Sequence, residues 1–251
     1  IYSVTSPSTK ANEMRESWII ARKELNSFFD SLVAYILLIA FLGFSGFFTW
    51  LWGSDIFYHK QASLNTFFNV ALWSLFFFIP AITMRQFAEE KKSGTIELLL
   101  TKRLTDRQLV IGKYLACILL VAIALAFTLP YYVSIARLGN IDHGSTITGY
   151  LGLLLMSSAY VSIGLLASSL TNNQIVAFLI ALLAGVVFQF ILGSVGSGQT
   201  GWIGSLLTDL SIPHHYDSMS RGVIDTKDVL YFLALTFLGL MLTEVVISKR
   251  K

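Results

Sequence analysis

The stretch that decides the fold is residues 144–208, GSTITGYLGLLLMSSAYVSIGLLASSLTNNQIVAFLIALLAGVVFQFILGSVGSGQTGWIGSLLT, which contain no Asp, Glu, Lys or Arg. A water-facing surface of ordinary composition does not contain such a run, whereas a bilayer needs about 20 apolar residues for each helical crossing. Residues 150–170 and 174–193 therefore predict two membrane-spanning helices, separated by the polar insert Thr171-Asn172-Asn173. Helix is expected because backbone polar groups in hydrocarbon must find partners within their own segment.

Four further stretches extend this pattern over the chain. Residues 32–52, 67–84, 109–136 and 229–247 are dominated by Leu, Ile, Val, Ala and Phe. Only 13% of the 251 residues are charged, against about 25% in soluble domains. The sequence therefore predicts an all-α polytopic membrane protein, in which residues 1–251 form a single transmembrane domain with six spans and no soluble catalytic head.

The distribution of Lys and Arg predicts the orientation of the spans. If both termini are cytoplasmic, only Lys60, Arg137, Arg221 and Lys227 of the 18 basic residues lie outside, which leaves 14 inside. This asymmetry follows the positive-inside rule, so we expect a multi-pass membrane protein with both termini on the cytoplasmic side. The net charge of +3 then describes a basic face that contacts lipid headgroups, and no nucleic-acid partner is expected.

Residues 12–30 predict a separate amphipathic helix before the first span. Trp18 and Phe28 belong to an apolar set at helical spacing, while polar residues such as Arg22 and Glu24 fall on the other faces. Such a helix is expected to lie along the membrane surface. The alternative is a cytosolic extension of the first span.

The cytoplasmic segment after the second span has the most unusual composition. It reads RQFAEEKKSGTIELLLT over residues 85–101, so a charged approach leads into an apolar run too short to cross a membrane. Ser93 or Gly94 can cap a short helix whose first turn contains Glu97. The leucines at 98–100 then form an apolar knob that needs a cover. Pro80, inside the second span, predicts a kink just before this segment.

These features together resemble the permease subunit of ABC-2 type transporters. The strings IPAITMRQFAEEKKSGTIELLL (79–100) and ASSLTNNQIVAF (167–178) are more narrowly similar to gliding-motility GldF-like permeases. The resemblance implies a coupling helix that docks on a separate ATP-binding subunit, with the N-terminal helix packed nearby. The residues it assigns to this ATPase-coupling interface are Arg85, Glu89, Glu90, Lys91, Gly94, Thr95, Glu97, Leu98 and Leu99.

The partners follow from the same resemblance. It implies GldA-like ABC ATPase subunits, which bind ATP and Mg²⁺, and a second permease copy or a GldG-like paralogue that completes a dimer. It also implies a link to gliding motility and a location in the bacterial inner (cytoplasmic) membrane. Neither ATP nor another cofactor is expected on this chain.

Two similar strings predict helix starts on the cytoplasmic side. Thr105 and Thr171 each stand three residues before a Gln and between apolar residues, as in a capping box with a hydrophobic staple. They would begin spans three and five. Asn172 and Asn173, beside the second of these starts, are therefore candidate contacts of a partner on the inner face.

The outer segment 193–228 predicts a short re-entrant or interfacial element between spans five and six. Its Gly-rich start lacks the Gly-Lys-Ser/Thr of a phosphate loop. His214 and His215 adjoin, and with His59 and His143 elsewhere no convergent metal-ligand set is expected.

The energy source is predicted to lie outside the chain, because the sequence contains no Gly-x-x-x-x-Gly-Lys-Ser/Thr motif. Known hydrolase and metalloprotease motifs are also missing from it, so no catalytic residue is assigned. The expected function is the permease subunit of an ABC exporter-type complex, in which ATP hydrolysis by the partner drives transport or mechanical work. The alternatives are a membrane-embedded enzyme acting on lipid or peptide and a non-transporting membrane scaffold.

Overall fold

The structure is a computed structural model that describes residues 7–52, 62–94 and 105–249. Over these ranges the regular structure is helical, without strands. In chain order the elements are α1 (Pro7–Asp30), α2 (Leu32–Trp50), α4 (Asn65–Thr83), α5 (Arg85–Lys92), α7 (Asp106–Ala126), α8 (Leu129–Leu138), α9 (His143–Leu170), α10 (Gln174–Val186), the π-helix η1 (Val187–Ile191), α11 (Leu192–Ser197), α12 (Trp202–Asp209), α13 (Ile212–Ser220) and α14 (Thr226–Ser248).

Six helical stretches are long and apolar enough to cross a membrane, which confirms the predicted fold class. They are α2, α4 with α5, α7 with α8, α9, α10 with η1 and α11, and α14. Several extend beyond the apolar runs, because hydropathy marks the part suited to hydrocarbon whereas capping groups set the helix ends. α9, for example, begins at His143, where the Asp142 carboxylate accepts a hydrogen bond from the backbone N–H of Ser145.

α9 is the central helix of the bundle. In its most apolar 18 residues, 72% of the segment is buried inside the protein, against 22% in the corresponding segment of α10, η1 and α11. Small residues let its neighbours come close. A Cβ atom added at Gly149 would lie 2.5 Å from the Phe68 ring of α4, and one added at Gly164 would lie 2.8 Å from the Thr83 Cβ of the same helix. Close approach at small residues is how helices pack without a hydrophobic driving force between them.

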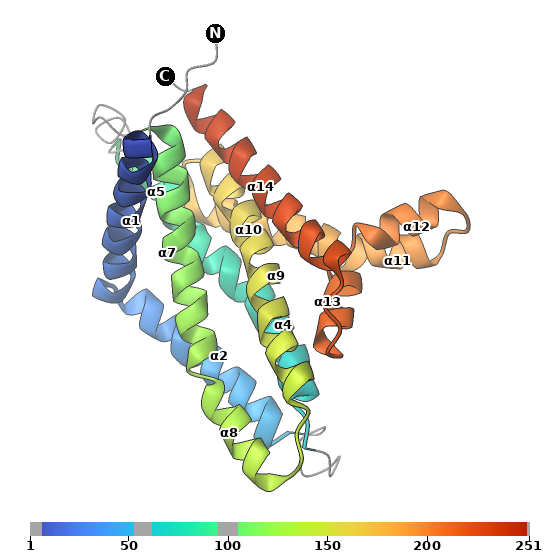
Figure 1. The fold of residues 1–251 in the computed structure, drawn as a ribbon. Coiled ribbons are helices and arrows are strands. Elements are labelled where there is room, and N and C mark those ends of the chain that lie inside the picture. The colour runs from blue at the N-terminus through green and yellow to red at the C-terminus, as the bar shows by residue number, and fades with distance from the viewer. Residues whose placement is uncertain (1–6, 53–61, 95–104, 250–251) are drawn as a thin grey trace.

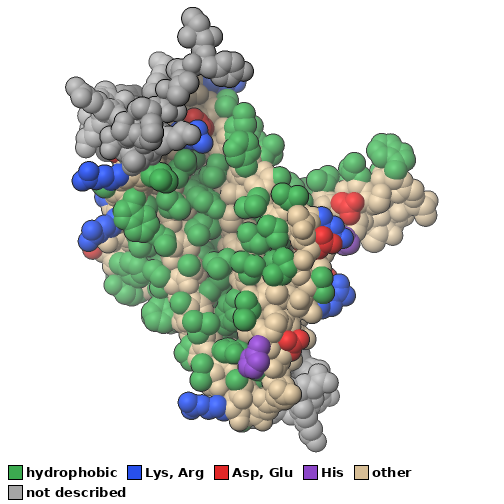
Figure 2. Space-filling view, in the orientation of Figure 1, with side chains coloured by type: hydrophobic (Ala, Val, Ile, Leu, Met, Phe, Trp, Pro, Cys, Tyr) green, Lys and Arg blue, Asp and Glu red, His purple; other side chains and the backbone are tan. Residues whose placement is uncertain are grey.

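The bundle has two distinct ends. The start of α1, the end of α14 and helix α5 lie at one end, while α8 lies at the other (Figure 1). Hydrophobic side chains cover most of the middle of the face that Figure 2 shows. This arrangement fits a bundle that crosses a bilayer with α5 and both ends of the helical chain on one side.

The two predicted surface elements are present as helices. α1 runs lengthwise beside α7, and the α11–α12 pair projects sideways from the bundle (Figure 1). Segment 193–228 contains α12, α13 and most of α11. How α1 and these outer helices lie relative to the bilayer surface stays a prediction.

Candidate functional site

The candidate site is centred on α5, the short helix that follows the second span. α4 stops at Thr83 and α5 starts at Arg85, so the helix is interrupted at Met84. Pro80, one turn earlier, has no backbone N–H and so removes one intrahelical hydrogen bond. The turn that lacks this bond lies inside α4, just before the interruption, and the Met84 N–H is still bonded to the Pro80 carbonyl at 3.0 Å.

A single hydroxyl group of α9 occupies this interruption. The Ser168 hydroxyl accepts hydrogen bonds from the backbone N–H groups of Phe87 (3.0 Å) and Ala88 (3.1 Å), and it donates one to the Met84 carbonyl (2.9 Å). All of these groups are buried or nearly so. Ser168 therefore supplies the partners that an uninterrupted helix would have provided, and it holds α5 against α9.

A buried lysine holds the opposite side of α5. The Lys113 ammonium of α7 lies 2.7 Å from the Glu90 carboxylate of α5 and 3.4 Å from the Glu24 carboxylate of α1, and its side chain is 1% exposed. It also lies 5.3 Å from the centre of the Phe87 ring, within cation–π range. One cation thus joins three helices.

The residue before Lys113 explains how α1 comes close enough. A Cβ atom added at Gly112 would lie 2.6 Å from the Ile20 side chain and 3.0 Å from the Ser17 carbonyl oxygen. Only glycine fits at that distance without displacing α1. Glu24 stands one helical turn after Ile20 on the same face of α1, which directs its carboxylate to Lys113.

A polar cavity of about 240 Å³ lies where α1, α5 and α7 meet. Its charged lining residues are Lys23, Glu24, Arg85, Glu89, Glu90 and Lys113. Acidic and basic groups are equal in number, so the charged side chains of the cavity have no net charge, although Lys113 among them is buried. Such a surface favours recognition of a complementary protein face over capture of a single ion.

A second polar cavity, of about 670 Å³, joins the end of α5 to the turn between α9 and α10. Lys92 lines it together with the turn residues Asn172 and Asn173. Lys91 also donates a hydrogen bond to the Ser169 carbonyl at the end of α9. The predicted inner-face asparagines and the predicted coupling segment, far apart in sequence, are therefore neighbours.

One of the two predicted capping boxes is wrong. Thr105 caps α7 with the full reciprocal pair, since its hydroxyl accepts from the Gln108 N–H and the Gln108 side chain accepts from the Thr105 N–H. Thr171 does not cap α10. Asn173 does so, because its side-chain oxygen accepts from the Ile175 N–H at 2.9 Å, and Asn is at least as good an N-cap as Thr.

The remaining residues of the predicted interface lie on α5, directly after it, or outside the described residues. Arg85 and Glu89 form an ion pair on α5 with a distance of 3.3 Å, and the Glu89 side chain is 51% exposed. Gly94 follows the end of α5 with a φ of 71°, a conformation that glycine adopts readily. Thr95, Glu97, Leu98 and Leu99 lie outside the described residues, so the predicted coupling helix is not tested.

The predicted apolar face of α1 is divided between two environments. Phe28 is 5% exposed and packs in the protein core, whereas Trp18 is 54% exposed. Grouping them on one membrane-facing surface was wrong for Phe28, because helical spacing does not show what covers a face and other parts of the protein cover this side chain. Glu24, expected on the polar face, is half-buried against Lys113, while Arg22 is exposed.

Lys113 is the site residue that sequence reasoning missed. It was counted only among the basic residues of the inner side, although it stands between the apolar runs LVIG and YLACILL. A lone lysine in such surroundings predicts a buried cation that needs an acidic partner.

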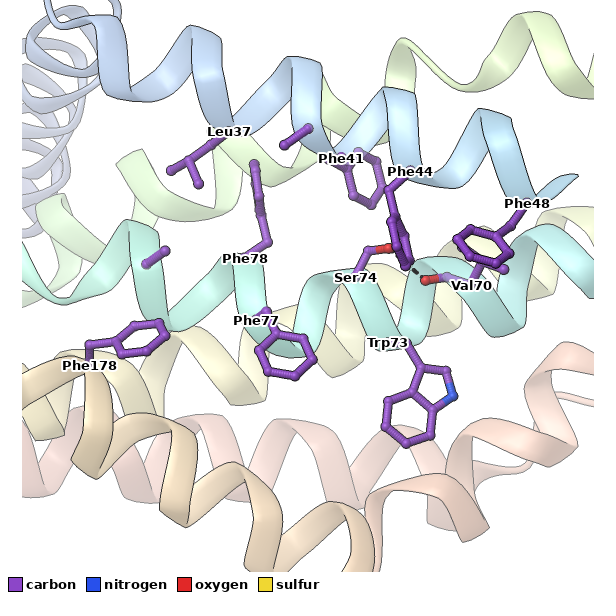
Figure 3. A pocket seen from close by; sticks show the side chains of 12 residues that line it. Leu37, Phe41, Phe44, Phe48, Val70, Trp73, Ser74, Phe77, Phe78 and Phe178 are labelled. Atoms are coloured by element: carbon purple, nitrogen blue, oxygen red, sulfur yellow. Dashed lines mark hydrogen bonds between the residues drawn. The ribbon is translucent and has the colours of Figure 1, made fainter. Parts of the chain in front are cut away.

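An apolar groove of about 690 Å³ lies between α2 and α4, within the span region (Figure 3). Its walls are mostly aromatic, including Phe44, Trp73 and Phe77. The Ser74 hydroxyl that lines it donates to the Val70 carbonyl at 2.8 Å. The groove therefore offers contact to apolar matter only, such as lipid chains or apolar side chains of another protein.

A compact polar cluster holds the outer helices. The Nδ1 atom of His215 lies 2.7 Å from the buried Asp228 carboxylate, and its Nε2 atom lies 2.6 Å from the Asp209 carbonyl oxygen. The Tyr231 ring stacks on His215 with 4.0 Å between ring centres. The cluster connects α12 and α13 to α14, and no group of three or more His, Cys, Asp or Glu within the described ranges could hold a metal.

The chain is similar to a known family of membrane transporters. The family model for "ABC-2 family transporter protein" matches residues 4–246, nearly the whole chain. No curated protein matches the chain.

Proposed function

This chain belongs to the ABC-2 transporter family and is a membrane permease of an ABC transporter, and from this premise we propose that it receives work from a separate ATPase through α5. The observation that supports this role is the position of α5. It leads directly into the residues predicted to dock on the ATPase, and it is fastened to α9 by Ser168 and to α7 and α1 by Lys113. A displacement of α5 would therefore move three helices of the bundle.

The proposed docking face includes both polar cavities. The α1–α5 cavity presents balanced charges, and the other places Lys92 beside Asn172 and Asn173. The face is proposed to be cytoplasmic, with both termini on that side, because the basic residues of the chain are concentrated there by the positive-inside rule. ATP and Mg²⁺ would bind to the ATPase, since this sequence contains no P-loop motif.

The complex is proposed to contain two permease subunits, either two copies of this chain or this chain with a paralogue. The narrower similarity of residues 79–100 and 167–178 supports a GldF-like role with a GldA-like ATPase and a GldG-like partner. In that role the complex would serve gliding motility, in the bacterial inner membrane, by transport or by mechanical work.

The proposal is tested by changing the predicted docking segment. Glu97→Arg places a cation at the positive end of a short helix, so we expect it to weaken ATPase binding by about 2 kcal/mol, or about 30-fold. The spans are untouched, and membrane insertion should be normal. Binding of the ATPase subunit is measured with purified permease, and Lys227→Glu on the opposite side of the spans is the control. Equal affinity of both variants would contradict the docking assignment.

A further inference from the structure

Lys113 has an environment that its place in a docking surface does not explain. A residue that only contacted a partner would be exposed, yet the Lys113 side chain is 1% exposed. Burying an ammonium group costs several kcal/mol unless acidic partners compensate it. Both of its partners, Glu24 and Glu90, come from other elements of the same chain, so the ion pairs are internal to the permease.

The ion pairs connect two helices that are otherwise little connected. α1 packs lengthwise on α7, and α5 packs chiefly on α9 and α10. α1 and α5 are also separated in sequence by the first two spans. Lys113 therefore provides a polar link between the N-terminal helix and the helix that leads into the predicted coupling segment.

The type of bond suits the transmission of movement. Exposed ion pairs are screened and contribute little, whereas removing one partner of a buried pair leaves an uncompensated charge and is costly. A shift of α5 that separated Glu90 from Lys113 would create such a charge. α5, α7 and α1 should therefore move together, while an exposed pair such as Arg85–Glu89 can open freely.

We propose that Lys113 is a positioning residue that makes α1, α5 and α7 move as one unit when the ATPase acts on α5. The inference rests on the proposed function. In this inference, the transmission of movement from the docking site depends on an internal ion-pair triad, Lys113 with Glu24 and Glu90, and not on the docking surface alone.

The test compares three variants of the full-length permease in complex with its ATPase subunit. The triple variant E24Q/E90Q/K113M removes all three charges while keeping side-chain size, which avoids a stranded buried charge. K113R keeps the cation. K227M is the matched control, because Lys227 pairs with Asp225 in an exposed ion pair at the other end of the bundle.

Three quantities are measured for each variant: the Kd for the ATPase subunit, the permease-dependent stimulation of ATP turnover, and the distance between spin labels at positions 18 and 93. Trp18 on α1 and Ser93 at the end of α5 are both exposed, so labels there report on the α1–α5 link directly.

In the triple variant we expect the stimulation measured at a saturating concentration of the ATPase subunit to fall about tenfold, as is typical of coupling between linked sites, and the distance distribution to broaden. K113R and K227M should keep stimulation and a narrow distribution. Wild-type stimulation in the triple variant would overturn the proposal. Stimulation that is lost only through a raised Kd, and is fully restored at a saturating concentration of the ATPase subunit, would also overturn it, since the triad would then only shape the docking surface. A wild-type chain that neither binds nor stimulates the ATPase would instead refute the proposed function.

Discussion

Replacing Ser168 by alanine tests how α5 is fastened to the central helix. The change removes the acceptor of two buried backbone N–H groups, those of Phe87 and Ala88. Hydrogen bonds between helices in membrane proteins contribute about 0.6 kcal/mol on average and up to about 1.7 kcal/mol. The Ser168 hydroxyl makes three such bonds, including the one that it donates to the Met84 carbonyl, so their loss should cost about 2 kcal/mol at the average value. A free-energy cost of about 2 kcal/mol raises the fraction of molecules in which α5 is detached about 30-fold, because each 1.4 kcal/mol is a factor of about ten.

Hydrogen–deuterium exchange measures this detachment directly. In Ser168→Ala, the amides of peptide 85–94 should exchange about 30-fold faster than in the wild type, while peptides from the middle of α9 should be unchanged. Ser169→Ala is a matched control, since Ser169 is equally buried but its hydroxyl donates to the Leu166 carbonyl within α9 at 2.7 Å.

Two results would refute this reasoning. Unchanged protection of peptide 85–94 in Ser168→Ala would mean that the hydroxyl does not hold α5. Equal loss of protection in Ser169→Ala would mean that α9 is perturbed generally, and that the geometry at Met84 has no particular role.

Two further predictions concern stability, measured by thermal unfolding in detergent. Phe28→Ala should cost about 3 kcal/mol because a buried aromatic ring is lost. Trp18→Ala should change stability by less than about 0.5 kcal/mol. Similar costs for both would contradict the division of α1 into a core face and an exposed face. His215→Ala should cost about 3 kcal/mol because it removes a hydrogen-bond partner of the buried Asp228 carboxylate. The exposed neighbour His214, changed to Ala, should have an effect within about 0.5 kcal/mol. Equal effects would show that the outer cluster does not hold α13 to α14.

The spans could be predicted because membrane crossing depends on the hydropathy of individual residues, which the sequence shows directly. Apolar runs of sufficient length with few charges define the spans, and five of the six observed helical stretches contain the predicted run in full, while α2 ends two residues before the end of its run at 52. Helix ends were less predictable. Thr105 was identified correctly as a cap, but at the start of span five the cap is Asn173 and not the predicted Thr171, because the spacing to Gln174 does not show which nearby side chain reaches the free N–H groups.

The candidate site could be predicted only in part, because it depends on which elements are neighbours. Periodicity shows that residues share a helix face, but it does not show whether protein, lipid or water covers that face, so Phe28 and Trp18 were grouped together. The pairing of Lys113 with Glu24 and Glu90 joins residues from three separate elements. No local pattern in the sequence contains such a contact.

The central claim, that the ATPase docks at α5 and the α9–α10 turn, is tested most directly by site-specific photo-crosslinking in the assembled complex. A crosslinking residue at Ser93 or at Asn172, both exposed, should form an adduct with the ATPase subunit. One at Ser197, exposed at the end of α11 beyond the fifth span, should form none. Adducts from position 197, or none from positions 93 and 172 in a complex that co-purifies intact, would contradict the account.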